Sequence, residues 1–400
     1  MARLLGGPPP AAGAESFAAH QNRRGALPTA LAERLIPQLE ALNLLGRGGA
    51  GFPVGRKWRA VAARANGKGV VLANGAEGEP LSTKDRTLMA SRPHLVIDGA
   101  LLAANAIGAD DIIFYVGIDH RAAEAAMRRA LAERSAELRG RARLVQAPRG
   151  YVAGEESAAV HFIDAGDPRP TTTPPRPYER GVAGRPTLVQ NVESLAAAAL
   201  IARGDDASTG LVTLSGAVRR AGVQEIALDA TLAGVAAAAG GPTRAAQAVL
   251  LGGYFGAFAH IDDVWALPLQ PRSLRARRLP FGCGVIHFLA EDACGVDATG
   301  RIMSYLASQS ARQCGPCLFG LEAIATATRR LAARSPQPGD LERLMRWSGQ
   351  IAGRGACKHP DGAAGLLRSA LTVFADDFDA HQGRHCVHAS APAALAVAVA

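Results

Sequence analysis

Aromatic side chains and long apolar runs are scarce in this sequence. Phe, Trp and Tyr make up only 5% of the 400 residues, which leaves few rings for stacking on nucleic-acid bases. No apolar run reaches the roughly 18 to 20 residues that a membrane span requires. The start, Met1 to Pro8, also lacks the apolar core of a signal peptide. We therefore expect no direct membrane insertion and a cytoplasmic protein, either free or peripheral to a membrane complex.

Acidic residues are in the minority among the charged ones. The chain has 35 Asp and Glu against 44 Lys and Arg, a net charge of +9. A basic balance is compatible with nucleic-acid binding, but no basic run is interleaved with aromatics. We therefore expect no nucleic-acid partner, and we interpret the charge as an arginine-rich, solvated surface that can also meet an acidic partner protein.

Cysteine is absent from the chain before residue 283. A reduced compartment argues against disulfides, so clustered thiols are either metal ligands or small hydrophobic side chains. The six cysteines are Cys283, Cys294, Cys314, Cys317, Cys357 and Cys386.

Glycine is abundant, and one short segment in the first part of the chain is especially rich in it. The segment from Gly46 to Trp58 contains five glycines and three cations. Glycine lets backbone amides approach phosphate oxygens, and the N-terminus of a following helix adds a favourable dipole. Gly46, Gly48 and Gly51 also satisfy G-x-G-x-x-G, a weak signal by itself. The segment is therefore a candidate phosphate-binding loop, and an ordinary glycine-rich loop is the alternative.

Residues 31–205 alternate short apolar runs with helical stretches. Apolar runs end at Asn74 and Gly117, and the segments 93–106 and 120–139 have helical composition and period. Short buried strands separated by helices predict an α/β domain with a mostly parallel sheet, whose ligands bind at the carboxyl ends of its strands. Asn74 follows one such strand directly, so chemistry is expected there.

The pattern changes twice in the remainder of the chain. Residues 206–290 have the pattern of a hairpin, a helix and a further strand, which predicts a small α+β domain. From 291 to 400 almost every segment has helical spacing, as in a helical bundle. Residues 1–30 are expected to form a flexible N-terminal extension.

Three further motifs complete a recognisable set: Asn74–Pro80 with Lys84–Arg86 after it, Tyr151–Ser157, and Gly184–Leu195. In this order and at these separations, together with the glycine loop, they resemble the flavoprotein subunit of NADH:quinone oxidoreductase (respiratory complex I), which also occurs in NAD-linked hydrogenases and formate dehydrogenases. The resemblance covers nearly the whole chain after about Leu42. It implies an FMN-binding domain at 31–205, a ubiquitin-like domain of SLBB type at 206–290 and a helical iron-sulfur binding domain at 291–400.

The resemblance also implies which residues hold FMN. Backbone amides suit the phosphate, Lys57 suits its negative charge, and amides or carboxylates suit the ribityl hydroxyls and the ring edge. Two positions depart from the family, since Ala76 replaces an aspartate and Gln190 replaces an asparagine. The implied FMN positions are Gly46, Gly48, Gly49, Lys57, Asn74, Glu77, Tyr151, Gly154, Glu155, Gln190 and Asn191.

Nicotinamide binding in the family uses aromatic rings around the adenine and a carboxylate near the nicotinamide, which is the implied catalytic group. Phe52 and Glu156 match one ring and the carboxylate, but Ala60 and Arg176 stand where two more rings would be. Losing two rings weakens binding by a few kcal/mol if each stacked base contributes roughly 1 to 3 kcal/mol. Arg176 can restore part of this by stacking, and its guanidinium can favour a phosphorylated dinucleotide.

Three cysteines match ligand positions of the family's 4Fe-4S cluster. Cys314, Cys317 and Cys357 correspond to three of the four thiolates, and the fourth position is Ala311. Soft thiolates suit iron, and a C-x-x-C turn lets two of them face one site. Cys386 becomes the fourth ligand if the tail folds back. The alternatives are zinc bound by the three thiols and His359, and a decayed site in which the thiols only pack.

These matches imply a flavin and iron-sulfur electron-transfer subunit. FMN accepts a hydride from NAD(P)H, and single electrons pass through a 4Fe-4S cluster to other redox subunits or to a ferredoxin-like acceptor. One alternative is a relay that exchanges electrons with ferredoxin and binds no nicotinamide. Another is a scaffold paralogue that has lost its cofactors. The substitutions at Ala76, Ala311 and Arg176 keep both alternatives open.

Overall fold

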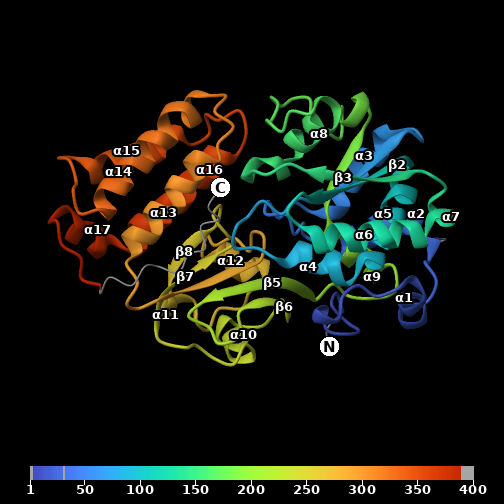
Figure 1. Ribbon diagram of the computed structural model, residues 1–400, viewed down its shortest axis with the longest axis horizontal. Coiled ribbons are helices and arrows are strands. Elements are labelled where there is room, and N and C mark those ends of the chain that lie inside the picture. Colours follow the sequence, from blue (N-terminus) through green and yellow to red (C-terminus); the bar gives the residue numbers. More distant parts are fainter. Residues whose placement is uncertain (1–2, 30–31, 389–400) are drawn as a thin grey trace. The chain divides into compact units, whose positions relative to one another are not determined.

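The computed structural model of the protein describes residues 3–29 and 32–388 (Figure 1). The chain divides into two compact units. The first unit comprises Met1–Gly78, Thr83–Leu211 and Glu225–Ala227, and the second comprises Glu79–Ser82, Val212–Gln224 and Leu228–Ala400. Over the described ranges, no helix has both the length and the apolar character needed to cross a membrane.

A four-stranded parallel sheet forms the centre of the first unit. Its strands lie in the order β3-β2-β1-β4, and each neighbouring pair is parallel. Val70 and Leu72 of β1 belong to one apolar cluster, whereas Val71 and Ala73 belong to another. Both faces of the sheet are therefore buried, as is usual for parallel sheets. The strands are β1 (Gly69–Gly75), β2 (Ala109–Gly117), β3 (Ala142–Ala147) and β4 (Thr187–Asn191). The predicted α/β architecture is confirmed.

Helices cover the sheet of the first unit. Two of them, α5 and α9, pack so closely that a Cβ on Gly99 would lie 2.0 Å from the carbonyl oxygen of Leu195. Glycine is required at this crossing because any side chain would overlap the neighbouring backbone. The helices are α1 (Phe17–Arg24), α2 (Ala32–Ala41), α3 (Val54–Ala65), α4 (Lys84–Ser91), α5 (Pro93–Ile107), α6 (Arg121–Glu133), α7 (Ser135–Leu138), α8 (Glu156–Ala165) and α9 (Val192–Ile201), with short turns η1 (Pro10–Ala12), η3 (Tyr151–Gly154) and η4 (Val182–Gly184).

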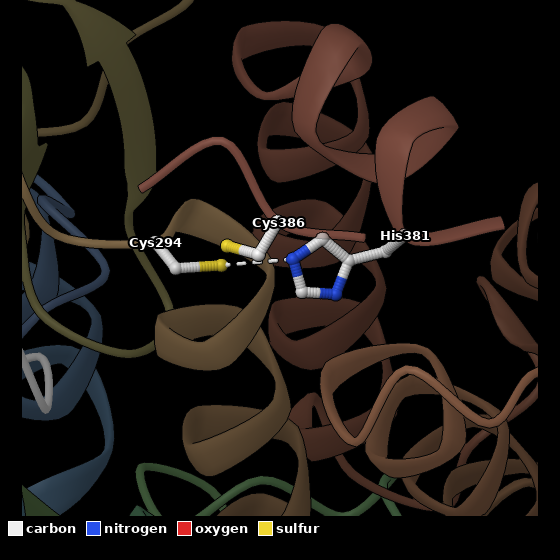
Figure 2. Close-up of side chains that lie close together, drawn as sticks. All are labelled: Cys294, His381 and Cys386. Carbon is white, nitrogen blue, oxygen red and sulfur yellow. Dashed lines mark hydrogen bonds between the residues drawn. The ribbon is translucent and has the colours of Figure 1, made fainter. Parts of the chain in front are cut away.

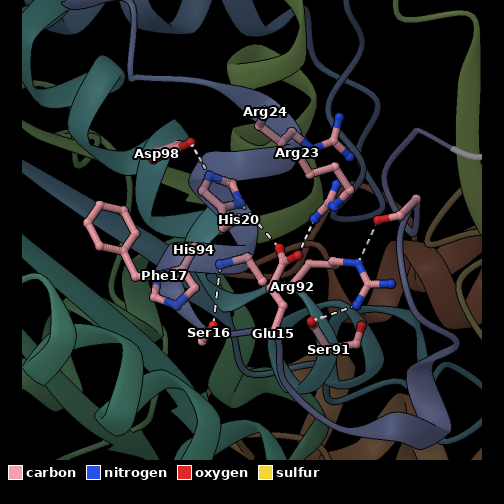
Figure 3. Close-up of polar contacts among 12 residues, drawn as sticks. Glu15, Ser16, Phe17, His20, Arg23, Arg24, Ser91, Arg92, His94 and Asp98 are labelled. Carbon is pink, nitrogen blue, oxygen red and sulfur yellow. Dashed lines mark hydrogen bonds and ion pairs between the residues drawn. The ribbon is translucent and has the colours of Figure 1, made fainter.

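The described part of the N-terminal segment is bound to the first unit through buried charges (Figure 3). His20 of α1 is 1% exposed, and its Nε2 lies 2.8 Å from Oδ2 of Asp98 in α5. Its Nδ1 lies 3.2 Å from Oε1 of Glu15. Arg92, also buried, donates from Nε to the carbonyl oxygen of Gly6 at 2.9 Å. The segment that we expected to be a flexible extension is therefore part of the folded unit over its described residues.

The middle of the chain forms a mixed five-stranded sheet in the order β6-β5-β9-β7-β8. Strands β5 and β9 are parallel, and β7 is antiparallel to both β8 and β9. The predicted strands and helix are present, and β8 and β9 are additional. The elements are β5 (Thr209–Gly216), β6 (Gly222–Ala227), α10 (Leu232–Ala238), β7 (Ala246–Leu251), β8 (Ala257–His260), α11 (Ile261–Val264), α12 (Pro271–Ala276) and β9 (Val285–Ala290).

The C-terminal region is helical, as predicted. Ile302 and Leu306 of α13, Leu331 of α14 and Leu366 of α16 are fully buried and supply its core. A π-helical turn, η5, precedes α14, and such turns are often found at functional sites. The elements are α13 (Gly295–Ser308), η5 (Pro316–Leu321), α14 (Glu322–Ala332), α15 (Asp340–Ile351), α16 (His359–Val373) and α17 (Ala375–Gln382).

Candidate functional site

The glycine segment forms a closed loop with open space beside it. The amide of Gly46 donates to the carbonyl oxygen of Phe52 at 2.9 Å, which closes the loop just before α3 begins. Gly49 and Gly51 have φ angles of +114° and +60°, and a Cβ at either would meet no atom within 4 Å. A Cβ on Gly48 would lie 3.2 Å from Cβ of Asn191. The loop therefore lies against the carboxyl end of β4, with room for a group at its glycines.

Two asparagines end adjacent strands beside this loop. Asn74 of β1 is in register with Asn191 of β4. Asn74 donates from Nδ2 to the carbonyl oxygen of Gly154 at 2.8 Å, and the amide of Ala76 donates to its Oδ1 at 3.2 Å. Asn191 caps α9, since the amide of Glu193 donates to its Oδ1 at 3.0 Å. The structure thus brings four sequence-predicted residues together: Gly48, Asn74, Gly154 and Asn191.

Two predicted carboxylates are engaged by helix N-termini. The amides of Asp85 and Arg86 donate to the Glu77 carboxylate at 2.8 and 3.0 Å, and Glu77 has an uncommon φ of +45°. Burial opposes its charge, but Arg86 and Lys84 hold the pKa of Glu77 below its ordinary value. These contacts fix the start of α4 rather than present a free carboxylate.

Glu155 has the same kind of role at α8. It is the N-cap residue of that helix, and the amides of Ser157 and Ala158 donate to its Oε2 at 2.9 and 3.0 Å. Burial raises the pKa of Glu155, although the hydrogen bonds from Ser157 and Ala158 oppose this rise. Tyr151 begins the η3 turn just before this cap. Both residues therefore shape the segment from which Gly154 accepts the Asn74 amide.

Glu156 lies between two cations. Lys57 Nζ is 2.8 Å from its Oε2, and Arg176 Nη1 is 3.7 Å from its Oε1. The side chains of Lys57 and Glu156 are about a quarter exposed, and that of Arg176 is 57% exposed. Phe52 is 52% exposed and lies under the guanidinium of Arg56, 5.9 Å from its ring centroid. The predicted dinucleotide residues Phe52, Glu156 and Arg176 are thus accessible, and Glu156 also pairs with Lys57, which was predicted to hold FMN.

Gln190 has an inward contact instead. It is 5% exposed, and Trp58 donates from Nε1 to its Oε1 at 3.2 Å. Its amide therefore ties the first turns of α3 to β4.

A buried ionic group near these residues was not given a role by the sequence. Lys84 Nζ lies 2.6 Å from Asp85 Oδ1 and 2.8 Å from Glu193 Oε2, and all three side chains are almost completely buried. Burial, with Glu77 and Glu193 nearby, raises the pKa of Asp85 to about 7 against the opposing effect of Lys84. Asn191 donates from Nδ2 to Asp85 Oδ2 at 2.7 Å. The sequence did contain a signal for this group, because Lys84, Asp85 and Glu193 are charged residues within the recognised motifs.

The three predicted cluster cysteines lie near the π-helical turn η5, where Cys317 has the other two as neighbours. Cys317 lies in η5, and its amide donates to the carbonyl oxygen of Cys314 at 3.0 Å. Burial, followed by the thiols of Cys314 and Cys357, raises the pKa of Cys317 to about 12. Cys317 therefore lies near both of the other thiols, although the three sulfur atoms do not all lie within 4.8 Å of one another. His359, the zinc alternative's fourth ligand, has its Nε2 2.8 Å from the carbonyl oxygen of Leu306.

Cys386 lies elsewhere (Figure 2). Its Sγ groups with Cys294 Sγ and a nitrogen of His381, all within 4.8 Å of one another. Cys294 caps the N-terminus of α13, whereas Cys314 follows its C-terminus. Because a helix rises 1.5 Å per residue, these 14 residues span about 21 Å. The structure therefore does not bring Cys386 to Cys314, Cys317 and Cys357.

Comparisons with known proteins agree with this arrangement. The family model of the Nuo51 FMN-binding domain matches residues 39–200, and the model of the NADH-ubiquinone oxidoreductase-F iron-sulfur binding region matches residues 297–381. The NADH-quinone oxidoreductase F 2 subunit of Rhizobium meliloti is 32% identical over 398 residues, covering 93% of this chain and 94% of that protein. The chain belongs to the family of NADH-quinone oxidoreductase F subunits. The corresponding Escherichia coli protein is 30% identical and covers 90% of this chain and 87% of its own length.

A solved structure also matches most of this chain. The chain resembles NAD+-reducing [NiFe]-hydrogenase in the H2-reduced state with a TM-score of 0.81 and 27% identity, over 92% of this chain and 67% of that one. The predicted family, the oxidoreductase activity of NADH dehydrogenase type, and FMN and a 4Fe-4S cluster as cofactors are confirmed by these matches. The FMN match falls on the first unit, and the iron-sulfur match falls on the second.

Proposed function

We propose that FMN is held by the glycine loop and the strand ends of the first unit, and that a nicotinamide dinucleotide binds at the exposed edge carrying Glu156. The observation that carries this proposal is the convergence of Gly48, Asn74, Gly154 and Asn191 beside open space at Gly49 and Gly51. When bound, FMN supplies two-electron acceptance and one-electron release.

The residues fit a phosphorylated flavin. Backbone amides at Gly48 and Gly49 lie a few residues before the N-terminus of α3, where the helix dipole favours an anion, and the Gly46 amide closes the loop on Phe52. Lys57, in the first turns of α3, supplies a positive charge close by. The side-chain amide of Asn74 holds the segment at Gly154, and that of Asn191 holds Asp85 at the start of α4. Glu77, Glu155, Tyr151 and Gln190 act as positioning residues, because their contacts fix α4, α8, η3 and α3.

Glu156 organises the dinucleotide edge. Its carboxylate contacts both Arg176, at the dinucleotide edge, and Lys57, the cation proposed for the FMN phosphate. The half-exposed ring of Phe52 offers one stacking surface for the adenine. Arg176 offers a planar cation that can stack or bind an added phosphate. The substrate is NADH or NADPH, and Arg176 decides between them.

The second unit holds the iron-sulfur cluster on Cys314, Cys317 and Cys357. Their mutual effect on the Cys317 pKa supports a common site. The fourth ligand is not a thiol at position 311, where the chain has alanine. Residues 206–290 form a ubiquitin-like domain of SLBB type, and residues 291–400 form the iron-sulfur domain. The electrons leave to another redox subunit, as the names of the relatives suggest.

Anaerobic purification followed by flavin, iron and sulfide assays tests these assignments. We expect about one FMN per chain, and Lys57→Ala should weaken FMN retention because a charge-assisted contact of roughly 1.5 to 3 kcal/mol is lost. Lys68→Ala is the matched control, since Lys68 is an exposed lysine of the same unit. A colourless protein that takes up no added FMN would contradict the proposal. Reduction of the flavin by ferredoxin alone, with neither nicotinamide nucleotide active, would select the relay alternative.

A further inference from the structure

A second group of metal-binding side chains lies at the opposite end of α13 from the cluster cysteines. Cys294 Sγ is 3.3 Å from His381 Nε2, and Cys386 completes a set of three ligand atoms that all lie within 4.8 Å of one another. Figure 2 shows the two sulfur atoms and the imidazole facing one another. We propose that Cys294, His381 and Cys386 bind one zinc ion. This site is separate from the proposed iron-sulfur site.

The spacing of the ligand atoms suits zinc. Zinc bonds sulfur at about 2.3 Å and histidine nitrogen at about 2.0 to 2.1 Å, so tetrahedral ligands lie about 3.6 Å (sulfur to nitrogen) and about 3.8 Å (sulfur to sulfur) apart. The observed 3.3 Å from Cys294 Sγ to His381 Nε2 is close to the first of these values. The three protein ligands leave one position for water or another small ligand.

His381 is held with the correct nitrogen facing the site. Its Nδ1 lies 2.8 Å from the carbonyl oxygen of Leu331, and a carbonyl can only accept a hydrogen bond. The proton must therefore be on Nδ1, which leaves the lone pair of Nε2 directed at Cys294. Metal-binding histidines are commonly oriented in this way, by donating their other ring N-H to a backbone carbonyl. His381 is 2% exposed, so this orientation is sheltered from water.

The thiols also have a reason to bind a cation. The amide of Asp297 donates to Cys294 Sγ at 3.4 Å, which places this sulfur at the N-terminus of a 14-residue helix where negative charge is favoured. Two thiolates and a neutral imidazole around one divalent ion have no net charge. Bound zinc therefore offsets the cost of burying two thiolates together.

The chain around Cys386 is held in place by other contacts. His388 lies 2.8 Å from Asp377 Oδ1 through Nε2 and 3.0 Å from the carbonyl oxygen of Glu291 through Nδ1. The amide of Gly295 donates to Asp377 Oδ2 at 3.1 Å. The segment bearing Cys386 is thereby fixed against both α17 and the start of α13. A zinc ion would join these same segments and fasten the end of the helical region to its beginning.

Metal analysis of paired variants tests the proposal. Chain purified anaerobically with added Zn2+ should contain about one zinc, and Cys294→Ser and His381→Gln should each lose most of it while keeping iron. A Cys314→Ala/Cys317→Ala double variant should show the reverse, losing iron and keeping zinc. Cys283→Ser is the matched control and should keep both metals, because Cys283 belongs to neither set. Loss of zinc in the double variant with retention in Cys294→Ser would overturn the proposal, whatever the iron content.

A measurement on the wild-type chain covers the case in which these variants do not fold. Thiol alkylation followed by peptide mass spectrometry should find Cys294 and Cys386 protected by Zn2+. After chelation, their rate of alkylation should rise at least tenfold. Equal reactivity with and without Zn2+ would contradict zinc binding. A peptide pair joined by a Cys294-Cys386 disulfide in the anaerobic protein would contradict it as well.

Discussion

The two units of this protein hold their candidate sites by different chemistry. In the first unit, buried charges lie directly behind the strand ends, as in the group of Lys84, Asp85 and Glu193. In the helical part of the second unit, the candidate ligands are thiols, and they divide into two sets at opposite ends of α13. Ionic and hydrogen-bonded contacts exist before any cofactor binds, whereas thiol sets gain their cross-links only with a metal. We therefore expect the first site to be preformed and the second region to depend on its metals.

The largest expected effect is the loss of metal from the cluster cysteines of the second unit. Cys317→Ala removes the most buried of the three cluster thiols, which is 5% exposed. Because every thiolate of an incomplete set matters for holding iron, the variant should lose most of its iron and sulfide. Anaerobic iron and sulfide assays measure this, with Cys283→Ser as the control. Full iron content in Cys317→Ala would contradict a cluster at this turn.

The next effect concerns the buried charges of the first unit. Lys84→Met leaves the Asp85 carboxylate buried without its cation and leaves Glu193 with the more distant cation of Arg47, at 3.9 Å; removing one partner of a buried pair costs about 3 to 5 kcal/mol. Hydrogen exchange of the β1 amides measures the loss in this unit alone. Arg149→Met, which removes an exposed partner of Asp119, is the control and should change nothing measurable. Unchanged exchange in Lys84→Met would show that the first site is not held by charge.

A gain of function tests the missing ligand. Ala311 is three residues before Cys314, at the position where the family has its remaining thiolate. Ala311→Cys should therefore slow the loss of iron in air, because a fourth thiolate completes the set. The rate of bleaching of the cluster absorbance measures this, and Ala311→Ser is the matched control. If Ala311→Cys bleaches as fast as wild type, another group already fills the fourth position.

The parts that the sequence predicted are those governed by local pattern. Alternation of apolar runs and helices was sufficient for the parallel sheet, and the topology of such a sheet then brought Asn74 and Asn191 to the same edge. Helical spacing was sufficient for the C-terminal region. In both cases the decisive information lies within a few neighbouring residues.

Pairings that depend on distant packing were not predictable. Cys386 was expected beside Cys314, but the partner of its neighbour His381 is Cys294, 87 residues earlier in the chain. The length of α13 separates the two sets of cysteines in space. The spacing of the cysteines along the sequence does not reveal this separation. Glu77 was similarly predicted to touch FMN, yet its carboxylate accepts two amides of α4. A motif indicates which residues surround a site, but not whether each one contacts the ligand or supports a residue that does.

A smaller effect is expected at the exposed dinucleotide edge. Arg176→Phe places a ring where the family has a stacking phenylalanine and removes a weak, exposed ion pair with Glu156 at 3.7 Å. NADH should bind about tenfold more tightly, since base stacking contributes roughly 1 to 3 kcal/mol. Stopped-flow reduction with NADH and NADPH measures this. A wild-type preference for NADPH that disappears in Arg176→Phe would assign Arg176 to an added phosphate instead.

The smallest effect should come from His20, whose charge supports the first unit far from the strand ends. The pKa of His20 lies above its ordinary value. Burial acts to lower it, but the contacts with Asp98 and Glu15 outweigh burial. A raised histidine pKa stabilises the fold fully below the ordinary value of about 6.5, and this contribution is lost as the pH rises through the raised value. The neighbouring His94 stays neutral over this range, because burial and then His20 lower its pKa to about 4.

His20→Gln should therefore destabilise the first unit more at about pH 6 than at about pH 9. The loss of stability in His20→Gln should be smaller than that in Lys84→Met. The partners of His20 keep other cations, because Arg134 and Arg203 also pair with Asp98, and Arg23 pairs with Glu15. Thermal unfolding at both pH values measures this, with His161→Gln as the control, since the ring of His161 contacts the backbone carbonyl of Arg169 at an exposed position. An equal loss at both pH values would mean that His20 supports the fold by packing, and that its charge adds nothing to the ionic character of the first unit.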